Sequence, residues 1–423
     1  MSKNITAEII AIGDEILFGQ ITNTNAQFIS AQLDKIGVAT LQQTAISDSA
    51  EVIKASLTEA LQRADIVLIT GGLGPTKDDL TKYTLAQFFD SELAINETAL
   101  AYITHLMVSR GREMNELNRL QALQPVKAKY IQNAVGTAPA MWFEAEGGKI
   151  VVAMPGVPFE MKYIMEYEII PAIKSRFSTQ QVVHYYIKTI GIAESALAIK
   201  IEDWENNLPS HIKLAYLPSY GQVKMRLTTS NPSEQVAQES LQTEAKKVLP
   251  IISKYVYHQG KDLDFETIIA EILKSNNLTL AIAESCTGGA LTALFTAMPG
   301  SSAYLKGGVI AYLRSIKENV LGVNPNTITE YGIVSEETAA EMAIGAAKLL
   351  GADVALSTTG VAGPDAYDNK PVGTVCIGVY FKGELFTQTF QLMNMRETNI
   401  RLACVMALNK LRHIFNEHGI GSN

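Results

Sequence analysis

A short, continuous run of β-branched and apolar residues, Ile66 to Thr70, limits the folds open to this chain. A strand with one solvated face alternates apolar and polar residues, whereas a continuous apolar run indicates a strand that helices cover on both faces. Further strand candidates lie at Ile5 to Ile12, Ile150 to Met154 and Leu278 to Ala283, and helical patterns separate them. This alternation predicts α/β architecture with mostly parallel sheets.

The length of 423 residues exceeds what one hydrophobic core usually supports, so more than one domain is expected. Strand and helix patterns alternate through residues 1–172, which we assign to a first α/β domain. Residues 173–258 change to a strand, a helix and two short strand candidates, which indicates a small α+β connector. Alternation returns in residues 259–423, a second α/β domain. Within the first domain, Asp48 and Glu51 have the N-cap and N3 spacing of a helix start.

Composition argues against several classes of function. The formal net charge is -8 and no run of Lys or Arg stands out, so a nucleic-acid partner is not expected. The cysteines are Cys286, Cys376 and Cys404, at no metal-like spacing, which favours a reducing compartment and predicts a cytoplasmic protein. No apolar run has the length of a membrane span and the first residues lack the features of a signal peptide, so no membrane partner is expected.

A candidate nucleophile stands in the run Ala281 to Gly289, where a buried strand candidate meets a helix. Ser285 would be held at the strand's carboxyl end, and the unsatisfied amides of the helix N-terminus would face a developing oxyanion. Gly288 and Gly289 would let a ligand approach the backbone closely. The alternative is that the hydroxyls cap the helix and the glycines serve tight packing.

A nucleophilic serine needs a base, and the histidines of this segment lie at a domain boundary and near the chain end. A lysine whose burial lowers its pKa can serve instead. Lys317 follows an apolar strand candidate and shares the next connection with Tyr312, although a solvated surface lysine would have the same pattern. The run Ser357 to Pro364, rich in hydroxyls and glycines, follows a third strand, and several such turns in one domain predict a ligand crevice.

These three segments, taken together, resemble the nicotinamide-nucleotide amidase domain of the CinA family. The resemblance implies that Ser285 attacks the carboxamide of nicotinamide mononucleotide and that Lys317 takes the hydroxyl proton. Ammonia would leave an acyl-enzyme, and water would release nicotinic acid mononucleotide. No cofactor is implied at this site.

The same resemblance implies roles for neighbouring side chains. Tyr312 should help to hold Lys317, Thr359 should contact substrate or oxyanion, and Glu284 should orient the site. The substrate would lie against four residues of the two turns: Thr287, Gly288, Gly289 and Gly360. An arginine would suit the substrate phosphate, and Arg396 and Arg401 are both candidates.

The strand candidate Ile66 to Thr70 runs into a glycine-rich turn, Gly71 to Asp79. This turn is not a P-loop, because no Gly-Lys-Ser/Thr follows, and it lacks the third glycine of a dinucleotide fingerprint. It offers an anion cradle followed by the adjacent carboxylates Asp78 and Asp79, which suits a phosphate with a divalent metal. A Gly-Pro turn with one of these aspartates as N-cap is the alternative.

Four polar turns accompany this segment, at Gly13 to Glu15, Asn23 to Asn25, Gly136 to Thr137 and Pro155 to Glu160. Together with it, they resemble the molybdopterin-binding fold that forms the first domain of CinA proteins. The resemblance implies a metal-dependent ADP-ribose pyrophosphatase that yields AMP and ribose 5-phosphate, with Mg or Co as the divalent ion. Asp78, Asp79 and Glu15 are the candidate metal ligands. The candidate substrate-binding residues are Gly72, Gly74, Thr76, Asn23, Gly156 and Glu160.

The middle segment resembles the small KH-like linker of the same family, but it has no evident Gly-x-x-Gly loop for RNA. The resemblance therefore implies a bifunctional pyridine-nucleotide hydrolase whose partners are nicotinamide mononucleotide and ADP-ribose. Homodimers are expected from the family. The alternative is a nucleotide- or molybdopterin-binding accessory protein, related to competence, with no turnover at one or both sites.

Overall fold

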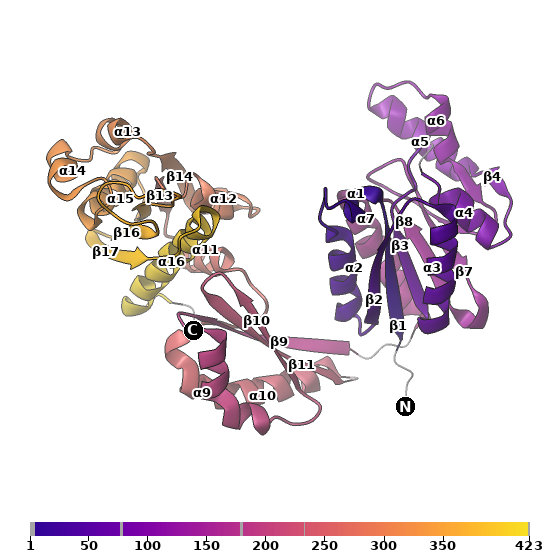
Figure 1. The fold of residues 1–423 in the computed structure, drawn as a ribbon, viewed down its shortest axis with the longest axis horizontal. Coiled ribbons are helices and arrows are strands. Elements are labelled where there is room, and N and C mark those ends of the chain that lie inside the picture. Colours follow the sequence, from indigo (N-terminus) through magenta and orange to yellow (C-terminus); the bar gives the residue numbers. More distant parts are fainter. Residues whose placement is uncertain (1–4, 77–78, 178–180, 232, 422–423) are drawn as a thin grey trace. The chain divides into compact units, whose positions relative to one another are not determined.

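The computed structural model describes residues 5–76, 79–177, 181–231 and 233–421. The chain divides into two compact units (Figure 1). The first unit comprises Met1–His184 with Thr228–Leu241, and the second comprises Tyr185–Leu227 with Gln242–Asn423. Each unit contains one α/β domain.

The first α/β domain is built on a six-stranded sheet with the strand order β2-β1-β3-β8-β7-β6 (Figure 1). Its strands are β1 (Thr6–Ile12), β2 (Ala39–Ile46), β3 (Ile66–Thr70), β6 (Lys129–Ile131), β7 (Ala140–Glu144) and β8 (Ile150–Met154). The pairs β1–β2, β1–β3 and β3–β8 are parallel, whereas β7 and β6 are antiparallel at one edge. Every residue of β3 is buried, as its continuous apolar run predicts.

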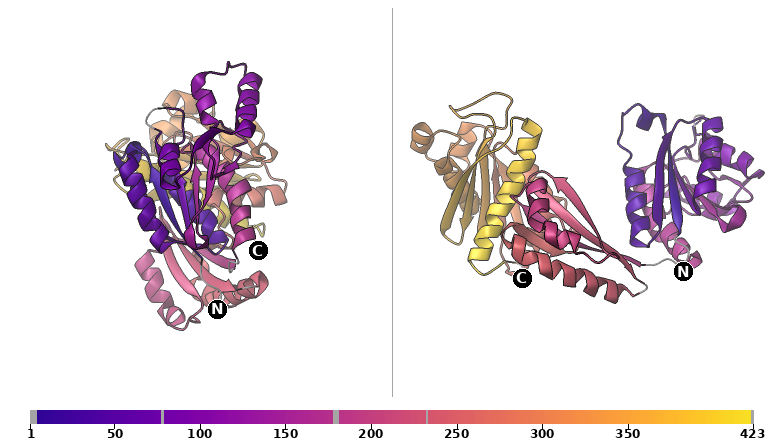
Figure 2. Two further views of the ribbon diagram at one scale, coloured as in Figure 1. Left: turned by 90° about the vertical axis from the view of Figure 1, so that its right-hand side faces the viewer. Right: turned by 60° about the horizontal axis from the view of Figure 1, so that its bottom comes forward.

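Helices cover both faces of this sheet (Figures 1 and 2). One face packs against α2 (Thr24–Lys35), α7 (Pro158–Ile164) and α8 (Ile170–Arg176), and the other packs against α3 (Ala50–Arg63) and α4 (Thr81–Phe88). The carboxyl ends of the parallel strands meet at one edge, where the amide of Gly71 donates to the carbonyl oxygen of Met154 at 3.1 Å. The loops after β1, β3 and β8 are therefore neighbours.

The start of α3 differs from the sequence prediction. The helix begins at Ala50 with Ser49 at the N-cap position, and no side chain caps it. The Asp48 carboxylate instead accepts a hydrogen bond from the backbone amide of Asp14 at 3.2 Å. The prediction of Asp48 as N-cap is wrong because the loop after β2 turns this side chain towards the loop after β1.

Within its described residues, the first domain contains seven further elements, of which α5 is the longest. They are α1 (Asp14–Leu17), α5 (Glu97–Ser109), α6 (Glu116–Gln121), β4 (Leu93–Ile95), β5 (Leu123–Pro125), the 3-10 turn Glu146–Gly148 and the π-helical turn Met165–Ile169. Strands β4 and β5 pair with each other in antiparallel fashion.

The connector is a small α+β module, as predicted. Its four-stranded sheet has the order β10-β11-β9-β12. The elements are β9 (Gln181–Ile190), α9 (Glu194–Asn206), β10 (Lys213–Ser219), β11 (Gln222–Asn231), α10 (Glu234–Ile252), the 3-10 turn Ser253–Tyr255 and β12 (Val256–Gly260).

The second α/β domain has a five-stranded sheet with the order β14-β13-β15-β16-β17. Its strands are β13 (Leu280–Glu284), β14 (Leu305–Ile310), β15 (Val354–Gly360), β16 (Thr374–Phe381) and β17 (Glu384–Gln391). Strand β13 lies between two parallel neighbours, β14 and β15, whereas β16 and β17 are antiparallel. The connection after β15 has no helix, and a parallel return needs such a crossover. The predicted α/β class is confirmed, with antiparallel strands at one edge.

Helices again cover both faces. One face packs against α11 (Phe265–Ser275), α12 (Ala290–Thr296) and α16 (Arg396–Glu417), and the other packs against α14 (Pro325–Tyr331) and α15 (Glu336–Leu350). The remaining elements are α13 (Arg314–Asn319) and the 3-10 turn Ser301–Ala303. Across the described parts of the chain, no helix combines the length and the apolar character that crossing a membrane requires.

Candidate functional site

Ser285 lies directly after β13, the central parallel strand of the second domain. Its backbone amide donates to the carbonyl oxygen of Thr358 on β15 at 2.9 Å, which extends the parallel pairing by one residue. Its side chain is largely buried, with 8% of the residue exposed. The hydroxyl therefore stands at the carboxyl edge of the sheet, as the sequence predicts for a residue at this junction.

Lys317 is the side chain that reaches Ser285. It lies in α13 and is fully buried, and its Nζ is 2.9 Å from Ser285 Oγ. The Nζ also donates to the carbonyl oxygens of Ala311, at 2.6 Å, and Tyr312, at 3.4 Å. A neutral amine has two N–H groups and one lone pair. The two carbonyls can take both N–H groups, and this leaves the lone pair for the serine hydroxyl.

Burial lowers the pKa of Lys317 from its usual value near 10.5 to about 8. Within the described residues, no carboxylate lies within ion-pair distance of its Nζ to oppose this effect. The cause is desolvation, which disfavours the charged ammonium. Near physiological pH, Lys317 is therefore neutral far more often than an exposed lysine.

Glu284 precedes Ser285 and is fully buried. Its carboxylate accepts hydrogen bonds from the backbone amides of Gly289 at 3.0 Å, Leu291 at 3.0 Å and Thr292 at 2.7 Å, and from the Thr292 hydroxyl at 2.5 Å. These are the first amides of α12. The expectation that they face an oxyanion is wrong, because Glu284 occupies them.

A hydrogen bond between two threonine hydroxyls joins the turn after β13 to the end of β15. One of the two, Thr358, was not among the predicted site residues. Thr287 Oγ1 lies 2.7 Å from Thr358 Oγ1, beside Ser285. The hydroxyl of Thr359 instead donates to the carbonyl oxygen of Ile333 at 2.9 Å. Because neighbouring side chains of a strand point to opposite faces, only one of the two threonines can face Thr287. The Ser357 to Pro364 run indicated this turn but not which of its threonines contacts Thr287.

The structure distinguishes the two candidate arginines, because Arg396 contacts Tyr312 and Arg401 pairs with Glu397. Arg396 donates to the carbonyl oxygen of Gly363 at 2.7 Å and to the Tyr312 hydroxyl at 3.3 Å. Arg401 pairs with Glu397 at 2.7 Å and lies over the ring of Tyr220. Tyr312 contacts Lys317 through its backbone carbonyl, while its side chain is 56% exposed. Arg396 is thus the arginine on the Lys317 side of the domain.

The glycines of the second domain differ in what surrounds them. Gly288 has a φ of +60°, and a Cβ added to it would meet nothing within 4 Å, so its outer face is open. A Cβ at Gly289 would come 3.1 Å from Ile310 Cδ1. At Gly360 it would meet the backbone carbonyl of Thr374 at 2.7 Å. Gly360 is therefore a packing glycine between β15 and β16.

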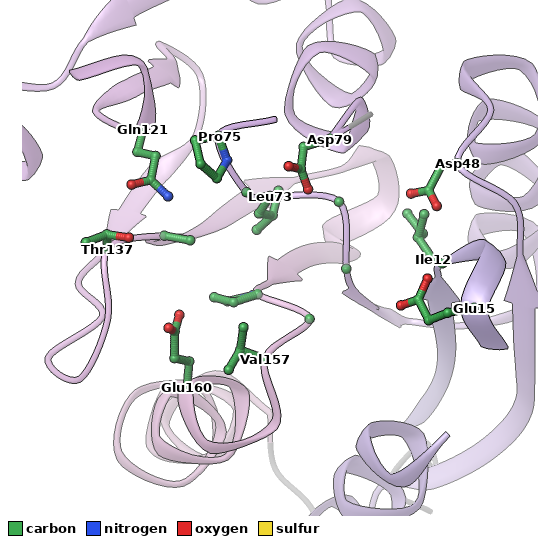
Figure 3. A pocket seen from close by; sticks show the side chains of 17 residues that line it. Ile12, Glu15, Asp48, Leu73, Pro75, Asp79, Gln121, Thr137, Val157 and Glu160 are labelled. Atoms are coloured by element: carbon green, nitrogen blue, oxygen red, sulfur yellow. The ribbon is translucent and has the colours of Figure 1, made fainter. Parts of the chain in front are cut away.

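The loops after the parallel strands of the first domain enclose a cavity of about 530 Å³ (Figure 3). This volume lies in the usual range of small-molecule sites. The residues that line it are Ile12, Gly13, Glu15, Asp48, Gly71, Gly72, Leu73, Gly74, Pro75, Asp79, Gln121, Thr137, Ala138, Pro155, Gly156, Val157 and Glu160. The cavity coincides with the strand ends at which the sequence predicts phosphate binding.

Three carboxylates, Glu15, Asp48 and Asp79, line one part of this cavity, and we call them the acidic group (Figure 3). The pKa of Asp48 is raised, first by burial and also by Asp14, Glu15 and Asp79. The predicted ligand Asp78 lies outside the described residues. Among the described ones, no three His, Cys, Asp or Glu side chains already stand close enough together to bind an ion.

Asp79 supports the glycine-rich turn. Its Oδ2 accepts from the Thr76 amide at 2.9 Å and from the Thr76 hydroxyl at 2.5 Å, so the predicted binding residue Thr76 has a structural contact. A Cβ at Gly74 would lie 2.5 Å from the same oxygen. Gly72 has a φ of +65°, and a Cβ there would lie 2.1 Å from Thr81 Oγ1. Both glycines lie where the turn packs closely, and Gly72 in addition has a backbone conformation that favours glycine.

Of the other predicted site residues in the first domain, Glu160 and Gly156 line the cavity, whereas Asn23 supports a helix start. Glu160 lines the cavity and accepts from Asn133 Nδ2 at 2.7 Å, and burial raises its pKa. Gly156 lines the cavity, and its carbonyl oxygen accepts from Asn25 Nδ2 at 2.8 Å. Asn23 instead caps α2, where its Oδ1 accepts from the Ala26 amide at 3.1 Å.

Three family models match consecutive parts of the chain. A probable molybdopterin binding domain matches residues 8–175, a damage-inducible protein CinA KH domain matches 184–258, and a CinA C-terminal domain matches 262–415. These matches cover both candidate sites and the connector.

Curated relatives match over nearly the whole chain. A CinA-like protein of Cytophaga hutchinsonii is 46% identical over 419 residues, which span 99% of this chain and 100% of that protein. A CinA-like protein of Flavobacterium psychrophilum is 40% identical, across 96% of this chain and 97% of that protein. A putative competence-damage inducible protein of Clostridium tetani is 38% identical, across 96% of this chain and 99% of that protein. With strand-end sites in both α/β domains and full-length similarity to these relatives, the chain belongs to the CinA family.

Proposed function

We propose that the second α/β domain hydrolyses the carboxamide of nicotinamide mononucleotide, with Ser285 as nucleophile and Lys317 as its base. One observation carries this proposal: a fully buried lysine stands 2.9 Å from a serine hydroxyl at the end of a central strand. Nucleophile and base within hydrogen-bond reach are the signature of covalent catalysis. A site that only binds a nucleotide has no need of this pair.

In each step of the proposed reaction, Lys317 takes up or gives the proton. Ser285 Oγ attacks the carboxamide carbon while its proton passes to Lys317 Nζ, and the carbonyls of Ala311 and Tyr312 stabilise the ammonium that forms. The Lys317 ammonium then protonates the nitrogen of the former carboxamide. The C–N bond breaks, ammonia departs, and the acyl group remains as an ester on Ser285 Oγ. Water attacks this ester while Lys317 takes its proton, and as the ester C–O bond breaks the Lys317 ammonium returns that proton to Ser285 Oγ. The products are nicotinic acid mononucleotide and the free serine.

The direct test is to incubate the purified protein with nicotinamide mononucleotide and to measure both ammonia and nicotinic acid mononucleotide. Equimolar release of the two supports the amidase. Binding of the nucleotide without release of either product contradicts it and favours the accessory-protein alternative for this domain.

The rate of this reaction is expected to depend on pH through Lys317. Only the neutral amine can take the serine proton, and its pKa is about 8. The value of kcat/KM should therefore rise as pH increases to about 8 and then level off. The profile is measured at substrate concentrations well below KM. A profile that stays flat across this range would show that Lys317 is not the base.

Arg396 is expected to bind the substrate phosphate. Its guanidinium lies with Tyr312 on the Lys317 side, whereas Arg401 is occupied by Glu397. Arg396→Ala should raise KM for nicotinamide mononucleotide about tenfold or more, because it removes a charge-assisted contact. Arg401→Ala is the matched control on the same helix and should leave KM nearly unchanged. Equal effects of the two substitutions would contradict this assignment.

We further propose that the first α/β domain is a metal-dependent ADP-ribose pyrophosphatase. The cavity combines glycine-rich backbone near Gly72 and Gly74 with the acidic group. Oxygen ligands of this kind suit Mg²⁺, which usually binds one or two carboxylates together with substrate phosphates and waters. One or two carboxylates of the acidic group, Glu15, Asp48 and Asp79, would thus hold the ion together with the substrate diphosphate and water, since no three described side chains already form a protein cage. The bound ion would neutralise charge on the diphosphate.

This second activity is tested with ADP-ribose, by measuring AMP and ribose 5-phosphate in the presence of Mg²⁺ and again after chelation. Release of both products that chelation abolishes supports the proposal. Absence of turnover with Mg²⁺ or Co²⁺ contradicts it, and copurification of a fluorescent pterin would instead favour a molybdopterin-binding accessory protein.

A further inference from the structure

Gln121 has a buried amide at the wall of the first-domain cavity. It is the last residue of α6, it is 4% exposed, and it lies beside Pro75 and Thr137 (Figure 3). Its Oε1 has no hydrogen-bond partner within the described part of the chain. A buried polar atom without a partner costs free energy, so proteins retain such atoms mainly where a ligand or ordered water pairs with them.

The chemistry of this amide restricts the ligand. A glutamine side chain offers one acceptor and one donor next to each other, and its last torsion is soft, so both atoms can turn towards the cavity. A phosphate or carboxylate only accepts hydrogen bonds and would pair with the donor alone. An adenine presents an amino donor beside a ring-nitrogen acceptor, and a glutamine amide pairs with both.

The position of Gln121 agrees with a nucleobase rather than with the diphosphate. In Figure 3, Glu15 and Asp48 lie on the far side of the cavity from Gln121. Between the two sides lie the apolar surfaces of Leu73 and Pro75. A metal and diphosphate at the acidic group would leave the Gln121 side for the flat, apolar faces of a base.

We propose that Gln121 selects the nucleobase of the first-domain substrate, by pairing with the amino group and N7 of an adenine. This proposal rests on the pyrophosphatase function proposed above, because it places a nucleoside diphosphate in the same cavity. Hypoxanthine has an oxygen in place of the amino group. Its oxygen and N7 both accept, and a glutamine amide cannot satisfy both.

The test compares the full-length protein with Gln121→Met and with the matched control Gln124→Met. Gln124 is also buried, at 6% exposed, and its Oε1 also lacks a partner among the described residues, but it does not line the cavity. Its Nε2 donates to the backbone carbonyl of Gln121 at 3.2 Å, so Gln124→Met also controls for a disturbance of the Gln121 backbone. Binding of AMP and of inosine monophosphate is measured by calorimetry. The ratio of kcat/KM for ADP-ribose and inosine diphosphate ribose is measured in parallel, and thermal unfolding checks the fold of each variant.

The parent and Gln124→Met are expected to prefer AMP about tenfold or more, which is the usual discrimination of a bidentate base contact. Gln121→Met should bind both nucleotides with affinities that differ by no more than about twofold. A parent without preference, or a preference that Gln121→Met retains, overturns the proposal.

The nucleotide-binding measurement and the hydrolysis measurement distinguish failure of the base-site proposal from failure of the pyrophosphatase proposal. A Gln121-dependent preference for AMP in a protein that does not hydrolyse ADP-ribose supports the base site and contradicts the enzyme activity. Hydrolysis of ADP-ribose with a substrate preference that does not change in Gln121→Met supports the enzyme activity and overturns the base site.

Discussion

Ser285→Ala and Lys317→Ala are each expected to lower kcat for nicotinamide mononucleotide by about 10³-fold or more, since one removes the nucleophile and the other its base. The two side chains act on one proton across a 2.9 Å contact. The double variant should therefore be only slightly slower than either single variant, because residues that act as a unit are not additive. Single-turnover measurements of product formation give the values.

Lys348→Ala is the control for the loss of a lysine, because Lys348 is an exposed residue of α15. It should retain the parent rate. Circular dichroism and thermal unfolding check that Lys317→Ala still folds, because this variant leaves a cavity where a buried side chain stood. If a folded Lys317→Ala loses only a few-fold in kcat, another group must be the base and the Ser/Lys assignment fails.

Glu284→Ala is expected to lower the free energy of unfolding of the second domain by about 3 kcal/mol or more, because several buried donors lose their acceptor together. The Glu284 carboxylate accepts from three backbone amides and one hydroxyl at the start of α12. Hydrogen exchange should accelerate at Gly289, Leu291 and Thr292. We expect activity to fall as well, because Glu284 fixes the turn that carries Ser285. Its role is that of a positioning residue.

Glu337→Ala provides the control for this second prediction. Glu337 is an exposed acid in the first turn of α15, where a carboxylate contributes at most about 1 kcal/mol through the helix dipole. Denaturant unfolding followed by circular dichroism measures both variants. If Glu284→Ala is as stable as Glu337→Ala and amide exchange near Gly289 is unchanged, the hydrogen bonds of Glu284 do not hold this turn.

Much of the fold was readable from local patterns. The run Ile66 to Thr70 forms a strand that is buried along its whole length, and the run that ends at Ala283 forms β13, which lies between the two parallel strands β14 and β15. The sequence did not predict that β16 and β17 pair in antiparallel fashion. The direction of a strand depends on the segment that connects it to the previous strand, and not on its own composition. The N-cap assigned to Asp48 failed for a related reason. Its spacing matched a cap, but the folded loop turns it to the cavity.

In the candidate sites as well, some residues follow from the local sequence and others are found only in the folded chain. Asp48 and Gln121 line the first-domain cavity but were not predicted as site residues, since the first had a sufficient local explanation and the second lies in no recognisable motif. The predicted residues Thr76 and Asn23 make local contacts that support a turn and a helix start. The sequence alone does not distinguish a polar turn residue that binds a ligand from one that hydrogen-bonds to the neighbouring backbone.

By itself, the sequence determined the α/β class, the place of Ser285 at the end of a strand and the glycine-rich turn of the first domain. These features depend on neighbours within a few residues, through apolar periodicity and turn chemistry. Only the tertiary structure decided that Lys317 reaches Ser285 across 32 positions of sequence, that Glu284 occupies the amides of α12, and that Thr358 faces Thr287. Those contacts depend on strand register, side-chain direction and burial, which arise when distant segments pack together.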